Sequence, residues 1–207
     1  MADSSSINSG SPSFLAAPSR DRGYLLTEQV NPASQQLDQL STDDLVGLFI
    51  EEDLRPQQAV SGARTALSQA VDAIAERLRG RGRLFYLGAG TSGRLGVLDA
   101  AECPPTFCSP PELVQGILAG GAPALLRSSE GLEDLESAAV TDLQQRGFGP
   151  EDCLVGIAAG GTTPYVRGGL GYARDLGALA IAMACVPTDQ APLPCSIDIR
   201  LLTGPEL

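Results

Sequence analysis

The chain contains no histidine, and this absence removes two common routes of covalent catalysis. The Ser-His-Asp triad and the Cys-His dyad both need an imidazole that exchanges a proton near neutral pH. Any acid–base step must therefore use carboxylates or other ionisable side chains. The sequence offers 25 Asp and Glu residues for that purpose.

Basic residues are scarce, and long apolar runs are absent. Lys and Arg number 14, which leaves a formal net charge of −11 and a pI near 4.3. Nucleic acids and anionic membranes both need a basic surface, so we expect neither as a partner. No apolar run is long enough to span a bilayer. A phosphorylated metabolite stays possible if backbone N–H groups build its pocket.

The five cysteines show no paired zinc-type spacing. Cys103 and Cys108 flank two prolines, but no second pair and no histidine completes a site. We therefore expect no metal, and reduced thiols in a cytosolic protein.

Three regions follow along the chain. Residues 1–23 are rich in Ser, Pro and Gly, and we predict a disordered leader rather than a secretory signal. Residues 24–56 form an N-terminal helical segment, with a helix that starts at Ser41 and is broken by Pro56. Residues 57–207 form the main domain, which opens with a long amphipathic helix ended by Gly80.

Apolar strands alternate with helices in the main domain. This order predicts an α/β three-layer sandwich with a five-stranded parallel sheet, whose ligands bind at the carboxyl ends of the strands. The expected strands are 84–87, 114–118, 154–158, 178–183 and 197–202, and the expected helices after the first strand run to about residue 101, over 133–146 and over 164–175.

The run Tyr86–Gly96 is the most informative segment. It follows an apolar strand and opens onto a helical pattern, with Gly90, Thr91, Ser92 and Gly93 at the turn. Glycines let backbone N–H groups approach an oxyanion, and a helix N-terminus adds positive partial charge. The segment predicts a pocket for a phosphate group.

A dinucleotide site is the competing interpretation of this run, since Gly88-x-Gly90-x-x-Gly93 fits the fingerprint. That site also needs an acidic residue at the end of the second strand, where the chain has only Leu118–Gly121. A Walker loop is excluded because no Gly-Lys-Ser/Thr follows.

A second loop also places glycine and hydroxyl side chains before a predicted helix. Gly161, Thr162 and Thr163 precede Pro164, which is favoured at the first helical position. Plain capping by Thr163 is the simpler explanation. Two such loops at one sheet edge favour a cradle for a sugar phosphate.

The run LGAGTSGRLGVLDAAECPP at 87–105 resembles the signature of N-acetylmuramic acid 6-phosphate etherases, which have the sugar isomerase (SIS) fold. The similarity extends from about residue 24 to the end, through the blocks at 27–32, 37–42, 130–134, 156–159, 163–166 and 203–206.

The resemblance implies a carbon–oxygen lyase that cleaves the lactyl ether of N-acetylmuramic acid 6-phosphate to N-acetylglucosamine 6-phosphate and lactate. The family acts by elimination and then hydration, in the recycling of cell-wall sugars. It implies no organic cofactor, a small amino-sugar phosphate as ligand, and a homodimer in the cytoplasm. Its proton donor corresponds to Glu102, and the base for the C2 proton corresponds to Glu133. Without the resemblance, Glu102 is an ordinary surface residue near a helix end, and Glu133 belongs to an acidic first turn.

The chemistry needs one carboxyl protonated and the other ionised. The neighbours of Glu102 in the sequence, Ala100–Pro105, predict an apolar surrounding. On a straight helix, however, Glu102 lies about 13 Å along the axis from the phosphate end at Gly93. We therefore expect either a site that a second subunit completes or a sharp bend in the helix.

The chain departs from the family pattern in two ways. Many members carry Ser-Gly-Arg-Thr where this chain has Gly160-Gly161-Thr162-Thr163. Members also continue beyond the block at 203–206, whereas this sequence stops at Leu207, so we expect a C-terminally shortened domain. The alternative function is a catalytically silent, regulatory sugar-phosphate-binding protein, and a sugar-phosphate isomerase is a minor third.

Overall fold

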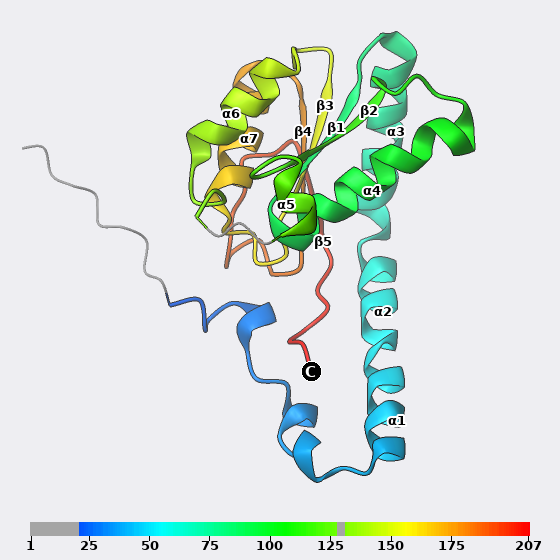
Figure 1. Ribbon diagram of the computed structural model, residues 1–207, viewed down its shortest axis with the longest axis vertical. Helices are drawn as coiled ribbons and strands as arrows, with labels where there is room; N and C mark the ends of the chain where they lie inside the picture. The colour runs from blue at the N-terminus through cyan, green and yellow to red at the C-terminus, as the bar shows by residue number, and fades with distance from the viewer. Residues whose placement is uncertain (1–20, 128–130) are drawn as a thin grey trace, which may run out of the picture.

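The computed structural model describes residues 21–127 and 131–207 (Figure 1). All but the last three residues of the expected leader lie outside the described residues. The elements in chain order are η1 (Leu26–Glu28), η2 (Pro32–Ser34), η3 (Leu37–Gln39), α1 (Thr42–Glu52), α2 (Leu54–Gly62), α3 (Arg64–Gly80), β1 (Leu84–Gly88), α4 (Gly90–Phe107), β2 (Val114–Leu118), α5 (Pro123–Leu126), α6 (Glu136–Gln145), β3 (Cys153–Ile157), α7 (Pro164–Asp175), β4 (Leu179–Ala184) and β5 (Ile197–Arg200).

The five strands form one parallel sheet in the order β2-β1-β3-β4-β5. Gly88 at the end of β1 stands opposite Leu118 on one side and Ile157 on the other, so three strands end level. The predicted parallel sheet is confirmed.

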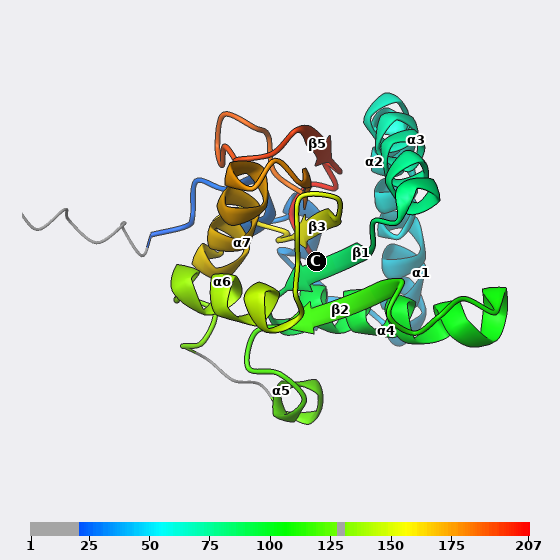
Figure 2. The same ribbon diagram turned by 90° about the horizontal axis from the view of Figure 1, so that it is seen from above.

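Helices cover both faces of the sheet, as Figure 2 shows from above. Alternation along β1 separates two cores: Phe85 and Leu87 face α6 and α7, whereas Leu84 and Tyr86 face α3 and α4. β3 and β4 alternate in the same way, because strands in a parallel sheet are buried on both sides. The predicted three-layer α/β sandwich is confirmed.

The backbone of α4 lies in direct contact with the backbone of the sheet. A Cβ atom on Gly93 would come within 2.5 Å of the Gly88 carbonyl oxygen, and one on Gly116 within 2.5 Å of the Val97 Cα. These positions therefore admit only glycine at this helix–sheet spacing. The contact fixes the N-terminus of α4 beside the end of β1.

α1 and α2 extend beyond the sheet as an arm, with the C-terminal segment beside it (Figure 1). Asn31, which is buried, donates from Nδ2 to Glu52 Oε2 at 2.9 Å and to the Pro205 carbonyl at 3.3 Å. The segment before it is held by Leu26 N–H, which donates to Gln190 Oε1 at 2.9 Å. One asparagine thus joins the N-terminal segment, α1 and the segment after β5.

Several helix boundaries differ from the expectation. α1 ends at Glu52 because the ring of Pro56 removes a donor and crowds the carbonyl four residues earlier. α4 was expected to end near residue 101, but it continues through Pro104 and Pro105 to Phe107. α6 begins at Glu136 rather than at 133, and the short α5 was not predicted. None of the helices described is long and apolar enough to cross a membrane.

Tyr165 is the largest fully buried side chain of the described residues. Its hydroxyl donates to Asp142 Oδ2 of α6 at 2.5 Å, which satisfies the buried polar atom. Burial, together with the neighbouring Asp142 carboxylate, raises the pKa of the Tyr165 phenol above its ordinary value of 10.

Gly168 sets the distance between α6 and α7. A Cβ there would meet the Glu136 carbonyl oxygen at 2.5 Å, whereas one on Gly171 would meet nothing within 4 Å. We expect Gly168→Ala to lower the free energy of unfolding by about 1–3 kcal/mol. Gly171→Ala should leave it unchanged or raise it by up to about 1 kcal/mol through helix propensity. Urea denaturation of both variants measures this, and equal shifts would contradict the close packing.

Alkaline pH should destabilise the fold through Tyr165. The unfolded chain releases the phenolic proton near pH 10, whereas the folded chain retains it, so the folded state binds more protons and stability falls as pH rises through 10. The Tyr165→Phe variant lacks this proton and should show a shallower fall. Urea midpoints measured from pH 8 to pH 11 test this, and parallel curves for the two proteins would refute it.

Candidate functional site

The strand order reverses direction between β1 and β3. The chain leaves β1 toward β2 on one side, whereas β3 pairs with β1 on the other. In open α/β sheets ligands bind where the strand order reverses in this way, at the carboxyl ends of the strands. Gly90–Gly93 follows β1 and Gly160–Thr163 follows β3, so both predicted loops flank this switch point.

The first loop leaves polar groups unused at the N-terminus of α4. Gly90 has φ of +53°, which starts the helix directly after the strand, and the N-cap Ala89 offers no side-chain cap. Thr91 is exposed and Ser92 half-buried. Within the described part of the chain, neither hydroxyl makes a hydrogen bond, so both are available to a ligand.

The second loop presents two further hydroxyls. Gly161 has φ of +66°, and a Cβ there would lie 2.8 Å from the Ala191 Cβ. Thr162 and Thr163 are half-buried, and Thr163 is the N-cap of α7 without using its side chain as a cap. The simple capping role considered for Thr163 is therefore wrong, and its hydroxyl faces no backbone partner at this helix end.

Glu133 lies beside the second loop. Its carbonyl oxygen accepts a hydrogen bond from the Tyr165 N–H, in the first turn of α7, at 2.9 Å. The residue is half-buried and precedes α6, so the expectation that it begins a helix is wrong. The main chain at Glu133 is thus tied to α7, the helix that has Thr163 as its N-cap. Glu130, in the same block, lies outside the described residues.

Glu102 lies on the outer face of α4. It follows Gly90 by twelve residues, about 18 Å along the helix axis, and α4 is continuous between them. Gly93, Gly96 and Ala100 are the buried residues of α4, and Glu102 is exposed on the opposite face. The apolar surrounding expected from its neighbours is therefore absent within one chain. A single chain does not bring Glu102 to the switch point.

Two groups near the site were not predicted. Asp142, which accepts from the Tyr165 hydroxyl, lies in a helix pattern with nothing to mark it as a partner. Leu25 is fully buried, and its Cδ1 would lie 3.4 Å from a Cβ on Gly160, so the N-terminal segment packs against the second loop. In the sequence, this packing is indicated only by an apolar residue, Leu25, shortly before the 27–32 block.

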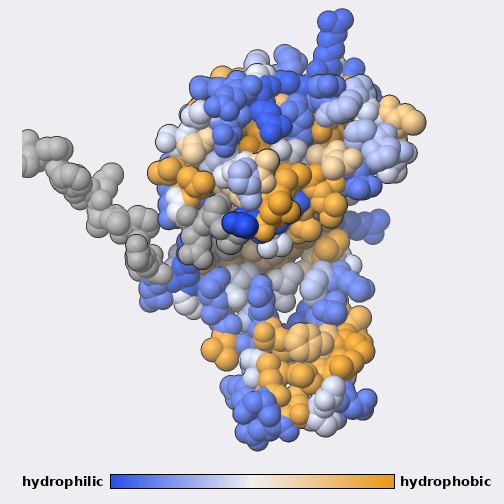
Figure 3. Space-filling model, in the orientation of Figure 1, coloured by the Kyte–Doolittle hydropathy of each residue, from blue (hydrophilic) through white to orange (hydrophobic). Residues whose placement is uncertain are grey.

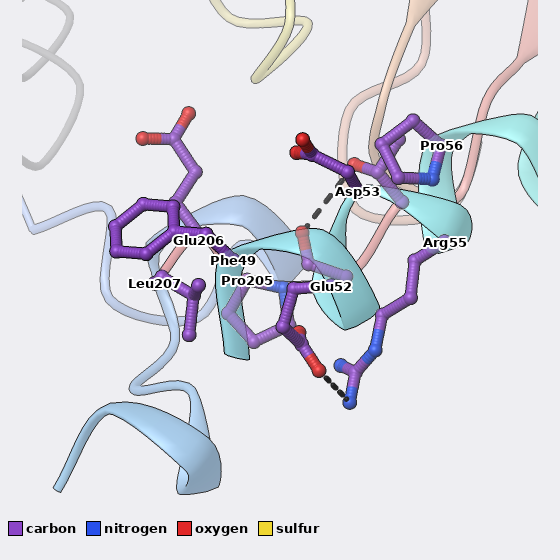
Figure 4. A pocket seen from close by; sticks show the side chains of 10 residues that line it. Phe49, Glu52, Asp53, Arg55, Pro56, Pro205, Glu206 and Leu207 are labelled. Atoms are coloured by element: carbon purple, nitrogen blue, oxygen red, sulfur yellow. Dashed lines mark hydrogen bonds and ion pairs between the residues drawn. The ribbon is translucent and has the colours of Figure 1, made fainter. Parts of the chain in front are cut away.

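Three cavities of the described residues lie away from the switch point. One of about 300 Å³ lies between the junction of α1 and α2 and the C-terminal segment (Figure 4). There Glu52 pairs with Arg55 at 2.8 Å and also accepts from Asn31. Others of about 290 and 740 Å³ lie at the outer edge of β2 and along α2 and α3.

The described residues contain no group of three or more Cys, Asp or Glu side chains arranged to hold a metal ion. The polar groups at the switch point are hydroxyls and backbone N–H groups, which suit an oxyanion.

Three similarities to known proteins accompany this geometry. The curated N-acetylmuramic acid 6-phosphate etherase of Synechococcus sp. (strain CC9902) is 77% identical over 92% of this chain. That of Parasynechococcus marenigrum (strain WH8102) is 77% identical over 93%. The chain spans 60% and 61% of the length of these relatives. A phosphoheptose isomerase from Francisella tularensis shares the fold, with a TM-score of 0.54 and 18% identity over 78% of this chain and 86% of that one.

A family model gives the membership. Residues 66–174, which carry β1, β2, β3 and both loops, match the model described as the glucokinase regulatory protein N-terminal SIS domain. The match covers more than half of the chain and ends within α7. The chain therefore belongs to the SIS-domain family.

Proposed function

We propose that the chain is the sugar-phosphate-binding part of a lyase that cleaves the lactyl ether of N-acetylmuramic acid 6-phosphate. The observation that carries this proposal is the meeting of three features at the β1/β3 switch point: two loops with free hydroxyls, two uncapped helix N-termini and the tethered Glu133. The 77% identity to curated etherases supports the choice of substrate. A silent binding protein would share the loops, and it is the alternative outcome of the test below.

The phosphate binds across the two loops in this proposal. Backbone N–H groups of Gly90, Thr91 and Ser92, with the hydroxyls of Thr91 and Ser92, take its oxygens at the start of α4. Gly93 lets the phosphate approach closely, while its own N–H donates to the Ala89 carbonyl. Gly161, Thr162 and Thr163 close the cradle from the start of α7. A protein with net charge −11 can hold a phosphate here because the donors are dipoles of the backbone rather than side-chain cations.

The two glutamates divide the proton transfers. In the open-chain sugar the C2 proton lies next to an aldehyde, so a carboxylate such as Glu133 removes it. The C3–O bond to lactate then breaks, and Glu102 delivers a proton to the departing oxygen, which leaves a C2=C3 double bond. Water adds back with its hydroxyl at C3 and its proton at C2, which gives N-acetylglucosamine 6-phosphate. No redox step and no organic cofactor enter this sequence.

The partner subunit supplies Glu102 in this proposal. Thr91, Leu95, Leu98 and Glu102 follow at spacings of four, three and four residues, so they share the outer face of α4. Leu95 is 57% and Leu98 58% exposed. Because an apolar stripe of this kind is usually covered, we place a second copy of the chain on it, with its switch point beside Glu102.

The arm extends this apolar surface. Val46, Phe49, Ile50 and Leu54 are exposed at helical spacing along α1 and into α2. Figure 3 shows hydrophobic surface over α4 and over the lower end of the arm on the same side of the molecule. Two patches facing one way suit the symmetric, self-complementary interface of a homodimer.

Compartment and organisation are further parts of the proposal. All five cysteines are free thiols, which suits the reducing cytoplasm. The division into an N-terminal helical segment at 24–56 and a sugar-phosphate-binding domain at 57–207 places its boundary inside α2.

Lactate release from N-acetylmuramic acid 6-phosphate tests the function. We expect release by the purified chain, together with exchange of the C2 proton with deuterium from solvent. Glu133→Gln should lose both, by about 10²–10⁴-fold, because the base is gone. Glu102→Gln should keep the exchange and lose the release, because only the leaving-group proton is missing.

Full lactate release by either variant would remove that residue from its role. If the unmodified chain binds the sugar phosphate, shown by a raised melting temperature, and releases no lactate, the silent binding protein is the better description.

Mixing the two variants tests the shared site. When Glu102→Gln and Glu133→Gln chains are unfolded, mixed in equal amounts and refolded together, half of the dimers should be mixed, and each mixed dimer has one intact site if Glu102 acts across the interface. We therefore expect recovery of about a quarter of the unmodified activity. Glu102 acting within its own chain predicts no recovery. Leu95→Ser with Leu98→Ser should lower both dimer content and activity, measured by light scattering and lactate release.

A further inference from the structure

One tyrosine connects Glu133 to the core at two points. Tyr165 is the second residue of α7 and is fully buried. Its N–H has no acceptor inside the helix, since it belongs to the first turn, and it donates to the Glu133 carbonyl at 2.9 Å. Its hydroxyl donates to Asp142 Oδ2 at 2.5 Å. The backbone N–H and the hydroxyl of Tyr165 thus both bond to the segment from Glu133 to Asp142.

These two bonds link α7 both to the segment before α6 and to α6 itself. Glu133 precedes α6 by three residues, and α6 carries Asp142 as its seventh residue. The helix between them is rigid, so the hydroxyl bond to Asp142 fixes how far α6 slides along α7. Gly168 brings the start of α6 into backbone contact with α7, which fixes the distance between the helices. The hydroxyl bond and the Gly168 contact together therefore set the position of Glu133 relative to the second loop.

The hydroxyl is the part of Tyr165 that a packing role alone does not need. Phenylalanine would fill the same volume, and an oxygen inside an apolar core costs free energy unless it is hydrogen-bonded. Here its acceptor is a carboxylate, which gives a stronger bond than a neutral group. Among the described backbone groups of 131–135, the Glu133 carbonyl bonds to α7, whereas the Leu135 carbonyl bonds only to the first turn of α6.

We propose that Tyr165, through its hydroxyl bond to Asp142, is a positioning residue that holds Glu133 at the switch point. The proposal rests on the function proposed above, because it gives Glu133 the role of base. Tyr165 touches no substrate in this account. Its effect is on where the Glu133 carboxylate stands, so removal of the hydroxyl should slow proton removal and leave phosphate binding as it was.

The chain offers a matched control. Tyr172 lies in the same helix and packs partly against the same core, and its hydroxyl makes no hydrogen bond within the described residues. Tyr165→Phe and Tyr172→Phe each remove one oxygen atom from α7. Asp142→Asn is the conservative variant, because its amide oxygen still accepts from the Tyr165 hydroxyl.

Two measurements follow on these three variants and the unmodified chain. The first is amide hydrogen exchange of residues 131–145, which needs no activity: Tyr165→Phe should speed it about tenfold or more, Asp142→Asn less, and Tyr172→Phe not at all. The second is kinetics: Tyr165→Phe should lower kcat and the C2 exchange rate together, by about ten- to a hundredfold, with KM within about twofold.

Each result separates the two proposals. Unchanged hydrogen exchange in Tyr165→Phe would overturn the positioning role whether or not the chain is active. Faster hydrogen exchange in that variant, with no lactate release by the unmodified chain, would support the tether while contradicting the proposed function. Equal losses in Tyr165→Phe and Tyr172→Phe, or a loss in KM alone, would show a general effect on packing and would also overturn the role.

Discussion

The structure depends on the close approach of α4 to the sheet. Where most helices rest on side chains, this one meets β1 and β2 at positions without a Cβ, and a methyl group on Gly96 would already lie 2.6 Å from the Tyr86 Cβ. The helix therefore cannot shift along the sheet without a clash. Its N-terminus is fixed beside the end of β1, and its outer face is turned to solvent. The position of the first loop and the exposure of Glu102 are two consequences of one contact.

The two sides of the switch point differ in how they are held. The loop before α4 is set by backbone contact with the sheet, whereas the region before α7 is set by side chains, with Leu25 packed on the second loop and Tyr165 bonded to Asp142. The first loop of the phosphate cradle needs only the first kind of rigidity, because its donors are main-chain N–H groups and short hydroxyl side chains next to them. A base needs the second kind, since its carboxylate must be aimed.

Sequence patterns predicted the sheet well because β1 to β4 are short, largely apolar runs, and the first three of them lead into loops that contain glycine. They failed where a distant partner decides the outcome. The acidic cluster around Glu133 imitates the first turn of a helix, but its carbonyl bonds to Tyr165 instead, and α6 starts later. Pro104 in α4 is typical of a residue just beyond a helix end, yet the helix continues to Phe107. The pairing of Tyr165 with Asp142, 23 residues apart, follows no local period at all.

The contacts of the N-terminal segment have a consequence for synthesis of the chain. Leu26 bonds to a residue 164 positions later, and Asn31 bonds to one 174 positions later. Chains are made at about 5–20 residues per second, so the segment emerges roughly 10–30 s before its partners exist. The first four strands are all synthesised in that interval, while the N-terminal segment still lacks these partners. Leu26 and Asn31 thus cannot complete their contacts until Gln190 and Pro205 have been made, however early they themselves are synthesised.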